Sequence, residues 1–332
     1  MHPAFSVILF TTLSGSGLGL WFWLALRIAT RGWPQGYDGF DLAYGLIAGG
    51  VLAVAGVLAS LWHLGKPARV WRAFSQWRSS WMSREGVLAV VCCALAIVLI
   101  LIAIGAPGEP MPDPFRPFDG LPPEPPSDAT VLWMRIAAAA LAPLAAATVF
   151  ATAMIYASLK PIPAWRHPLA VVSYLLFAAV GGALLFGPFA GTTLDDPSWV
   201  GAGIVVGATA LWRIKRRYWR DIDRSPLPQD TGDAVGLPGR TVSSFERPHT
   251  ESNYLTREMG FVVARKHAHK LRTISVVLFA LIPVLCALPV WLLPHGDVTV
   301  LLWLGAVSFQ LGALVERWLF FAEAKHLVTL YY

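Results

Sequence analysis

The sequence predicts an all-α integral membrane protein, a single domain in which about eight transmembrane helices form a bundle. Of its 332 residues, 56% are hydrophobic and only 14% are charged, and the mean hydropathy is +0.57. A soluble domain needs more charge than this on its surface. Helices that cross a bilayer core of about 30 Å need about 20 apolar residues. The runs that fit or approach this template are 4–26, 42–62, 86–104, 131–158, 168–190, 199–212, 274–293 and 298–321.

The first and the sixth of these runs are the least typical of transmembrane helices. No Lys or Arg precedes the first run, which is longer than the apolar part of a secretory signal, so we expect a retained helix. The sixth run, 199–212, is the shortest and requires flanking residues or a locally thinned bilayer in order to cross. The side assignments of all later loops depend on this crossing.

Two connections differ from the others in composition. The third loop, 105–130, contains EPMPDPFRPF and GLPPEPPSD, whose prolines favour extended backbone and predict a stiff external cover. The sixth loop, 213–272, begins with RIKRRYWR and ends with NYLTREMGFVVARKHAHKLR, which predicts a basic amphipathic helix. Such a helix suits either an anionic lipid surface or a soluble partner, and both interpretations remain open.

Positive charge separates the two sides of the predicted bundle. The net charge of +6 raises the question of nucleic-acid binding, but the 26 Lys and Arg lie almost entirely between apolar runs, which argues against it. They concentrate in the second, fourth and sixth loops, and cations near span ends favour the cytoplasmic side. We therefore predict a bacterial inner-membrane protein with both termini in the cytoplasm and the proline-rich loop in the periplasm.

The sequence has no signature of a bound metal or haem. Its three cysteines, Cys92, Cys93 and Cys286, all fall inside apolar runs and form no CxxC or CxxCH motif. None of the eight histidines lies in the middle of a run, which disfavours a haem with two histidine ligands. We expect no metal site in this chain.

The main candidate site is at the basic face, where one connection joins His63 at the end of the second run to Glu85 at the start of the third. This connection returns the chain to the same depth and can bring both side chains together. Histidine titrates near neutral pH, and a carboxylate beside it completes a proton relay. The alternative is that His63 is an interfacial hydrogen-bonding residue and Glu85 serves the first helical turn.

Further charged and aromatic residues surround this candidate site. Ionisable groups at membrane depth are costly and therefore informative, which singles out Glu316 and Arg317 in the eighth run. Adjacent helical residues point about 100° apart, so we expect each of the two to meet a different neighbour. The arginines of the second loop have an alternative role as headgroup anchors. The predicted pocket or its mouth comprises Lys66, Arg69, Arg72, Trp81, Arg84, Glu316 and Arg317.

Three segments carry a family resemblance that extends over essentially the whole chain. MHPAFSVILFTTLSGSGLGL, HLGKPARVWRAF and SSWMSREG resemble the membrane-anchor subunits of dimethyl-sulfoxide-reductase-type molybdoenzymes. SQWRSSWMSREG, ESNYLTREMGF and FFAEAKHLVTLYY are most similar to the anchors of sulfite dehydrogenases that face the cytoplasm. In this family the equivalents of His63 and Glu85 contribute to quinone chemistry.

The resemblance implies a three-subunit oxidoreductase. A catalytic subunit would hold the molybdenum cofactor and an iron–sulfur subunit would hold [4Fe–4S] clusters, both on the cytoplasmic side, while this chain binds neither. Electrons from sulfite oxidation would pass through the clusters to a membrane quinone, ubiquinone or menaquinone, bound by this chain. The alternatives are a quinol-oxidising anchor of an S-oxide or N-oxide reductase, a transporter, for which no inverted repeats are visible, and a scaffold without a redox role.

Overall fold

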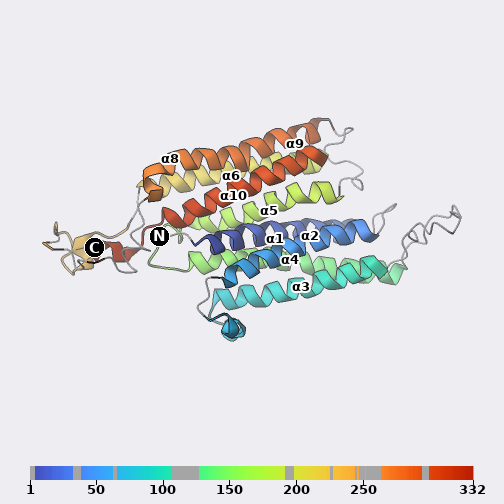
Figure 1. Ribbon diagram of the computed structural model, residues 1–332, viewed down its shortest axis with the longest axis horizontal. Helices are drawn as coiled ribbons and strands as arrows, with labels where there is room; N and C mark the ends of the chain where they lie inside the picture. Colours follow the sequence, from blue (N-terminus) through green and yellow to red (C-terminus); the bar gives the residue numbers. More distant parts are fainter. Residues whose placement is uncertain are drawn as a thin grey trace.

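The computed structural model is a bundle of long helices that lie side by side (Figure 1). It describes residues 4–32, 39–62, 66–105, 127–190, 198–224, 227–243, 245–246, 251, 263–293 and 299–331, and no strand occurs among them. The prediction of an all-α fold is therefore confirmed. Its elements are α1 (Phe5–Arg31), α2 (Gly39–Leu61), η1 (Pro67–Phe74), α3 (Trp81–Gly105), α4 (Asp128–Ala157), α5 (Pro168–Ala190), α6 (Ser198–Arg224), α7 (Thr231–Ala234), α8 (Val263–Val276), η4 (Val277–Leu281), α9 (Ile282–Leu292), α10 (Thr299–Ala322) and η5 (Leu327–Tyr331).

Seven of the described helices are long and apolar enough to cross a membrane by length and composition. They are α1, α2, α3, α4, α5, the continuous helix from α8 to α9, and α10. Helix α6 is as long as α1 and packs against α5 and α9, although its second half is too charged to meet the same composition criterion. Together with α6, these seven give eight long helices among the described residues. They run side by side along the bundle (Figure 1).

Helix α6 differs from the short span predicted at 199–212, because it continues through Arg224. The basic segment 213–224, which we expected at the start of a loop, is helical. The buried face of α6 continues into this segment, because Ala208, Leu211, Lys215 and Trp219 recur three or four residues apart. This spacing is that of one helical face, so packing extends the helix into the charged segment.

Helix α1 occupies the middle of the bundle and packs against α2, α4, α5 and α10. Two of its indole N–H groups reach neighbouring helices, since Trp21 donates to the Leu46 carbonyl and Trp23 to the Ala179 carbonyl, each at 2.8 Å. Gly19 lies against Gly182 of α5, where a Cβ on either residue would overlap the backbone of the other helix. Small residues of this kind allow close helix contact in membranes.

A π-helical turn, η4, interrupts the helix between α8 and α9. The N–H of Ile282 bonds to the Val277 carbonyl five residues earlier, so the next carbonyl, that of Leu278, would need the N–H of residue 283. Residue 283 is proline and has none. Ser308 of α10 supplies the missing donor, with its hydroxyl 2.9 Å from the Leu278 oxygen. The proline and the serine together account for the π turn and its contact with α10.

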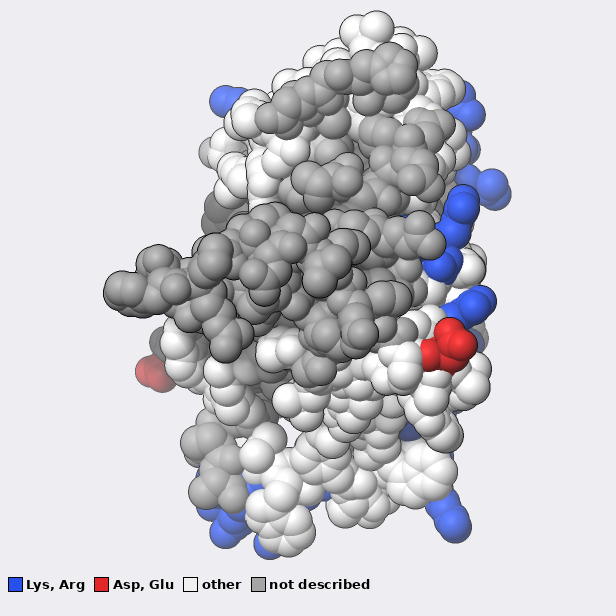
Figure 2. All heavy atoms as spheres, turned by 90° about the vertical axis from the view of Figure 1, so that its right-hand side faces the viewer, with Lys and Arg blue, Asp and Glu red and all other residues white. Residues whose placement is uncertain are grey.

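The two ends of the bundle differ in charge. Helices α2, α4 and α6 end, and α3, α5 and α8 begin, at the end where both termini lie (Figure 1). Figure 2 views the opposite end, whose described surface is largely uncharged, with blue atoms mainly around its outline.

The predicted proline-rich loop and the segment ESNYLTREMGF lie largely outside the described residues, whereas the predicted basic helix is present as α8 from Val263.

Candidate functional site

A cavity of about 500 Å³ opens between α1, α2, α3, α4 and η1, and we call it the large cavity. Most of its wall is apolar, with Leu18 and Trp21 from α1, Val57 and Leu58 from α2, and Val90 from α3. Its polar lining residues are few, namely Ser14, Ser60, Lys66, Arg69, Glu85, Cys93, Thr148 and Tyr156. An apolar cavity of this size with a small polar set suits a hydrophobic molecule that carries a polar head.

One wall of the large cavity faces the outside of the bundle. Val54 and Leu58 of α2 and Val90 of α3 line it, and they are 46%, 55% and 57% exposed. These apolar side chains lie within spanning helices, where the surroundings are lipid rather than water. A molecule dissolved in the bilayer therefore meets apolar side chains on this side of the cavity, along α2 and α3.

Glu85 is placed in the cavity by the first turns of α3. It is partly buried, and the Thr152 hydroxyl of α4 donates a hydrogen bond to its Oε1 atom. The following residue, Gly86, has no side chain, and a Cβ there would lie 3.0 Å from the Phe74 ring. Phe74 can thus lie over the start of α3, and Ser83 donates to the Ala73 carbonyl to fix η1 in the same place. The only acidic group lining the large cavity within the described residues is Glu85.

Lys66 and Arg69 form the cationic rim of the large cavity. Both line it, and Lys66, which is exposed, precedes the first turn of η1. This places two of the predicted mouth residues together with Glu85 around one cavity. His63, the other half of the predicted relay, lies outside the described residues.

Arg72, Trp81 and Arg84 do not line the large cavity, although the sequence placed them in the pocket or at its mouth. Arg84 stacks on Trp81 at 4.3 Å, and its guanidinium donates to the carbonyls of Trp77 at 3.0 Å and Arg78 at 2.6 Å. Arg72 stacks on its neighbour Trp71 at 5.5 Å. Arg84 thus braces the turn between η1 and α3, whereas the contact of Arg72 lies within η1.

Glu316 and Arg317 belong to a separate, fully buried cluster and not to the large cavity. Glu316 Oε1 lies 2.5 Å from Lys215 Nζ of α6, and Glu316 Oε2 lies 3.3 Å from Arg317 Nε. Our expectation that each residue would meet a different neighbour is confirmed, because Glu316 meets Lys215 and Arg317 lies over the Tyr174 ring. The expectation that the two would not also pair was wrong, since long side chains can bend toward each other despite their different starting directions.

Three polar residues of α4 at or beside the large cavity were not predicted from the sequence. Thr148 and Tyr156 line the large cavity, and Thr152, one turn from each, bonds to Glu85. A spacing of four residues puts all three on one helix face, and that face was visible in the sequence. Its significance was hidden because threonine commonly bonds to its own helix backbone, as Thr148 also does with the Leu144 carbonyl at 2.8 Å.

Metal ligands do not gather anywhere in the part of the chain that the structure describes. No three His, Cys, Asp or Glu side chains approach one another there in a group that could hold an ion. The three cysteines are unpaired thiols within helices. The chemistry available at the large cavity is therefore that of a carboxyl group, hydroxyl groups, a thiol and two cations.

Comparison with known proteins places this arrangement in a family. A family model described as DMSO reductase anchor subunit (DmsC) matches residues 1–111, which include α1, α2, η1 and α3 and thus most of the large cavity's wall. The chain is also 32% identical to a sulfite dehydrogenase subunit from Allochromatium vinosum, in an alignment that covers 100% of this chain and 99% of that protein. With its helical bundle and apolar spans, the chain belongs to the family of membrane-anchor subunits of DMSO-reductase-type complexes.

Proposed function

We propose that this chain is the quinone-reactive anchor of a molybdoenzyme that oxidises sulfite, and that the large cavity is its quinone site. An anchor of this family works with catalytic and electron-transfer subunits. In the proposed reaction, an iron–sulfur partner delivers two electrons that originate from sulfite, and a quinone in the cavity takes them up with two protons to become a quinol. The molybdenum and iron–sulfur cofactors belong to the partner subunits.

The observation that carries this proposal is the placement of Glu85 inside an apolar cavity that opens toward lipid. Quinones partition into the bilayer, and their rings require apolar walls while their oxygens require a proton donor and hydrogen bonds. Val57, Leu58 and Val90 supply the walls, and Glu85 supplies a titratable group where the ring oxygens can reach it. Lys66 and Arg69 at the rim stabilise negative charge that develops as electrons arrive.

We further propose that the basic end of the bundle, with both termini, faces the cytoplasm of a bacterial inner membrane. Its connections carry Arg78, Lys160 and Arg166, and Arg84 lies in the first turn of α3, as the positive-inside bias requires. Ser79→Cys places a thiol in an exposed turn at this end. A membrane-impermeant maleimide should label it in inverted vesicles and not in intact spheroplasts, with Ala129→Cys at the other end giving the reverse pattern. Labelling of Ser79→Cys in spheroplasts would contradict this orientation and indicate the opposite one.

The quinone assignment is tested by filling the cavity. Ala89 lies one turn after Glu85 and lines the wall, so Ala89→Trp places an indole where the quinone ring is proposed to bind. With the complete complex in membranes and a chemical donor reducing the partner subunits, we expect the KM for a short-chain quinone to rise at least about tenfold, because about 1.4 kcal/mol of binding is lost.

The matched control is Ala94→Trp, an exposed position of the same helix that lies outside the cavity. It should leave the quinone KM within about twofold of the unmodified complex. Reduction of an artificial acceptor by the partner subunits should be normal in both variants. Unchanged quinone kinetics in Ala89→Trp, with the complex assembled, would exclude the large cavity as the site.

A further inference from the structure

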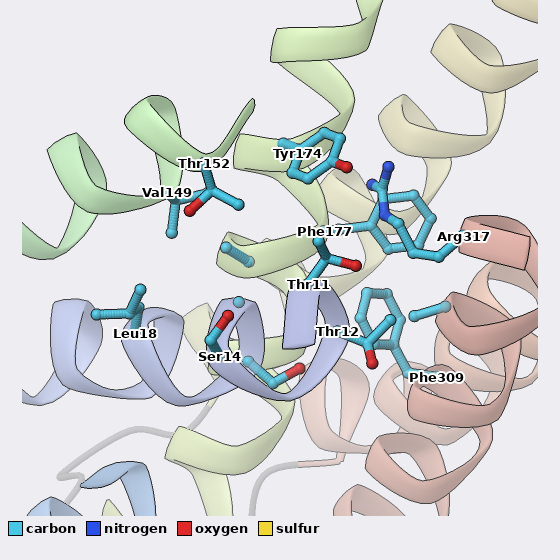
Figure 3. Close-up of a pocket in the computed structure, with 14 residues that line it drawn as sticks. Thr11, Thr12, Ser14, Leu18, Val149, Thr152, Tyr174, Phe177, Phe309 and Arg317 are labelled. Carbon is cyan, nitrogen blue, oxygen red and sulfur yellow. The ribbon is translucent and has the colours of Figure 1, made fainter. Parts of the chain in front are cut away.

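A second, much smaller cavity lies between α1, α4, α5 and α10, and we call it the small cavity. Its volume is about 20 Å³, and a site needs roughly 10–15 Å³ by this measure to hold one water molecule. Its wall is unusually rich in hydroxyl groups for the interior of a membrane bundle. They come from Thr11, Thr12, Ser14, Ser16, Thr152 and Tyr174 (Figure 3).

Arg317 closes one side of the small cavity. Its guanidinium lies 3.8 Å over the Tyr174 ring, and its Nη2 atom meets no hydrogen-bond partner among the described residues. The Tyr174 hydroxyl likewise has no partner of good geometry within the described part of the chain. Both residues are buried, with 2% of Arg317 and 4% of Tyr174 exposed. Buried donors are rarely left unpaired in proteins, and a cavity beside them supplies the partner as water.

Charge also favours water at this place. Arg317 shares the Glu316 carboxylate with Lys215, whose Nζ atom lies 2.5 Å from it, whereas Arg317 approaches it only through Nε at 3.3 Å. A buried cation that is not fully paired is costly unless dipoles surround it. The aromatic faces of Tyr174 and Phe177 supply part of this stabilisation, and a water oriented in the small cavity would supply more.

Thr152 closes the opposite side and joins the small cavity to the large one. Its hydroxyl lines the small cavity, bonds to Glu85 Oε1, and also lies 3.1 Å from the Thr148 carbonyl. A hydroxyl has one proton and two acceptor positions. When Glu85 is ionised, Thr152 can donate to it; when Glu85 is protonated, Thr152 can accept from it and donate to Thr148. The same side chain therefore serves both protonation states of Glu85.

We propose that water in the small cavity, held by Arg317 and Tyr174, supplies protons to Glu85 through the Thr152 hydroxyl. This inference rests on the proposed quinone function. Each proton that Glu85 gives to a quinone oxygen is replaced when Thr152 passes its own proton to Glu85 and takes one from the water. The hydroxide that remains lies beside the Arg317 guanidinium until exchange of this water with solvent replaces it. The electrons come from the iron–sulfur partner. Arg317 and Tyr174 act as positioning residues, because they touch the water and not the quinone.

Two isosteric variants test the relay in the complete membrane complex. Thr152→Val removes the linking hydroxyl, and Tyr174→Phe removes a hydroxyl that has no partner of good geometry among the described residues. For each we expect kcat for quinone reduction to fall about tenfold or more, with the quinone KM unchanged and a larger solvent deuterium isotope effect. Thr152→Ser keeps the hydroxyl and should restore the rate.

The control is Ser173→Ala, which removes a buried hydroxyl that donates to Leu169 in its own helix and lines neither cavity. It should leave kcat and the isotope effect unchanged. A normal kcat in Thr152→Val and Tyr174→Phe, while a Glu85→Gln complex is slow, would overturn the relay and leave the quinone site standing. A normal rate in all three variants would overturn both the relay and the proposed quinone site. A raised KM with unchanged kcat would assign Thr152 to binding and overturn the relay.

Discussion

Glu85→Gln should lower the rate of quinone reduction by at least about 100-fold while the complex still assembles. The substitution keeps the size of the side chain and can still accept a hydrogen bond from Thr152, so the packing of α3 against α4 is preserved. It removes the only acidic group that lines the large cavity within the described residues. Positioned acid–base groups contribute roughly 10²-fold to 10⁴-fold to rates, which sets the size of the expected loss.

The measurement for this prediction is quinone reduction by membranes that contain the complete complex, alongside reduction of an artificial acceptor by the partner subunits. The artificial reaction should be normal, since it bypasses the cavity. Asp128→Asn, which changes a carboxylate in the first turn of α4 at the opposite end of the bundle, is the control and should have no effect. A Glu85→Gln complex with the full rate would remove Glu85 from the proton chemistry.

Gly19→Ala should prevent normal assembly although it adds a single methyl group. The added Cβ would overlap the Ala178 carbonyl of α5, which is backbone and cannot rotate away. Relief requires α1 and α5 to separate, and α1 is the helix on which α2, α4 and α10 also pack. Overpacking of a close contact costs about 1–3 kcal/mol, and a loss of that size lowers abundance several-fold.

The quantity to measure is the amount of this chain and of its partner subunits retained in membranes. Gly203→Ala in α6 is the matched control, since a Cβ there meets nothing within 4 Å and alanine favours the helix. Accumulation of Gly203→Ala should equal or exceed that of the unmodified chain. If Gly19→Ala accumulates to the same level as the unmodified chain, α1 and α5 are farther apart at Gly19 than in the structure.

The fold was largely predictable because membrane crossing depends on local composition. A run of apolar residues long enough to span the bilayer has few alternatives to a helix, so 42–62 and 168–190 could be located without tertiary information. Helix α6 was harder to predict because its second half is charged. Its buried face through Lys215 and Trp219 depends on contacts with other helices, and composition does not report those contacts.

The site was predictable only in part. Glu85 stood out because a carboxylate near membrane depth is costly and needs a reason. The shape of the large cavity depends on how η1 folds over α3 through Phe74 and Gly86, which no local pattern encodes. The pairing of Glu316 with Lys215 joins α10 to α6, and a contact between two helices so far apart in the chain is not encoded in either segment alone.

The location of a bound quinone tests the central claim most directly. A photoreactive quinone analogue should be irradiated in membranes that contain the unmodified complex, and the modified residues should then be mapped by mass spectrometry. We expect the label on the cavity-lining parts of α2, 53–61, and α3, 82–93, and its loss when excess natural quinone competes. Competed labelling confined to α6, α9 or α10 would contradict the assignment of the large cavity as the quinone site.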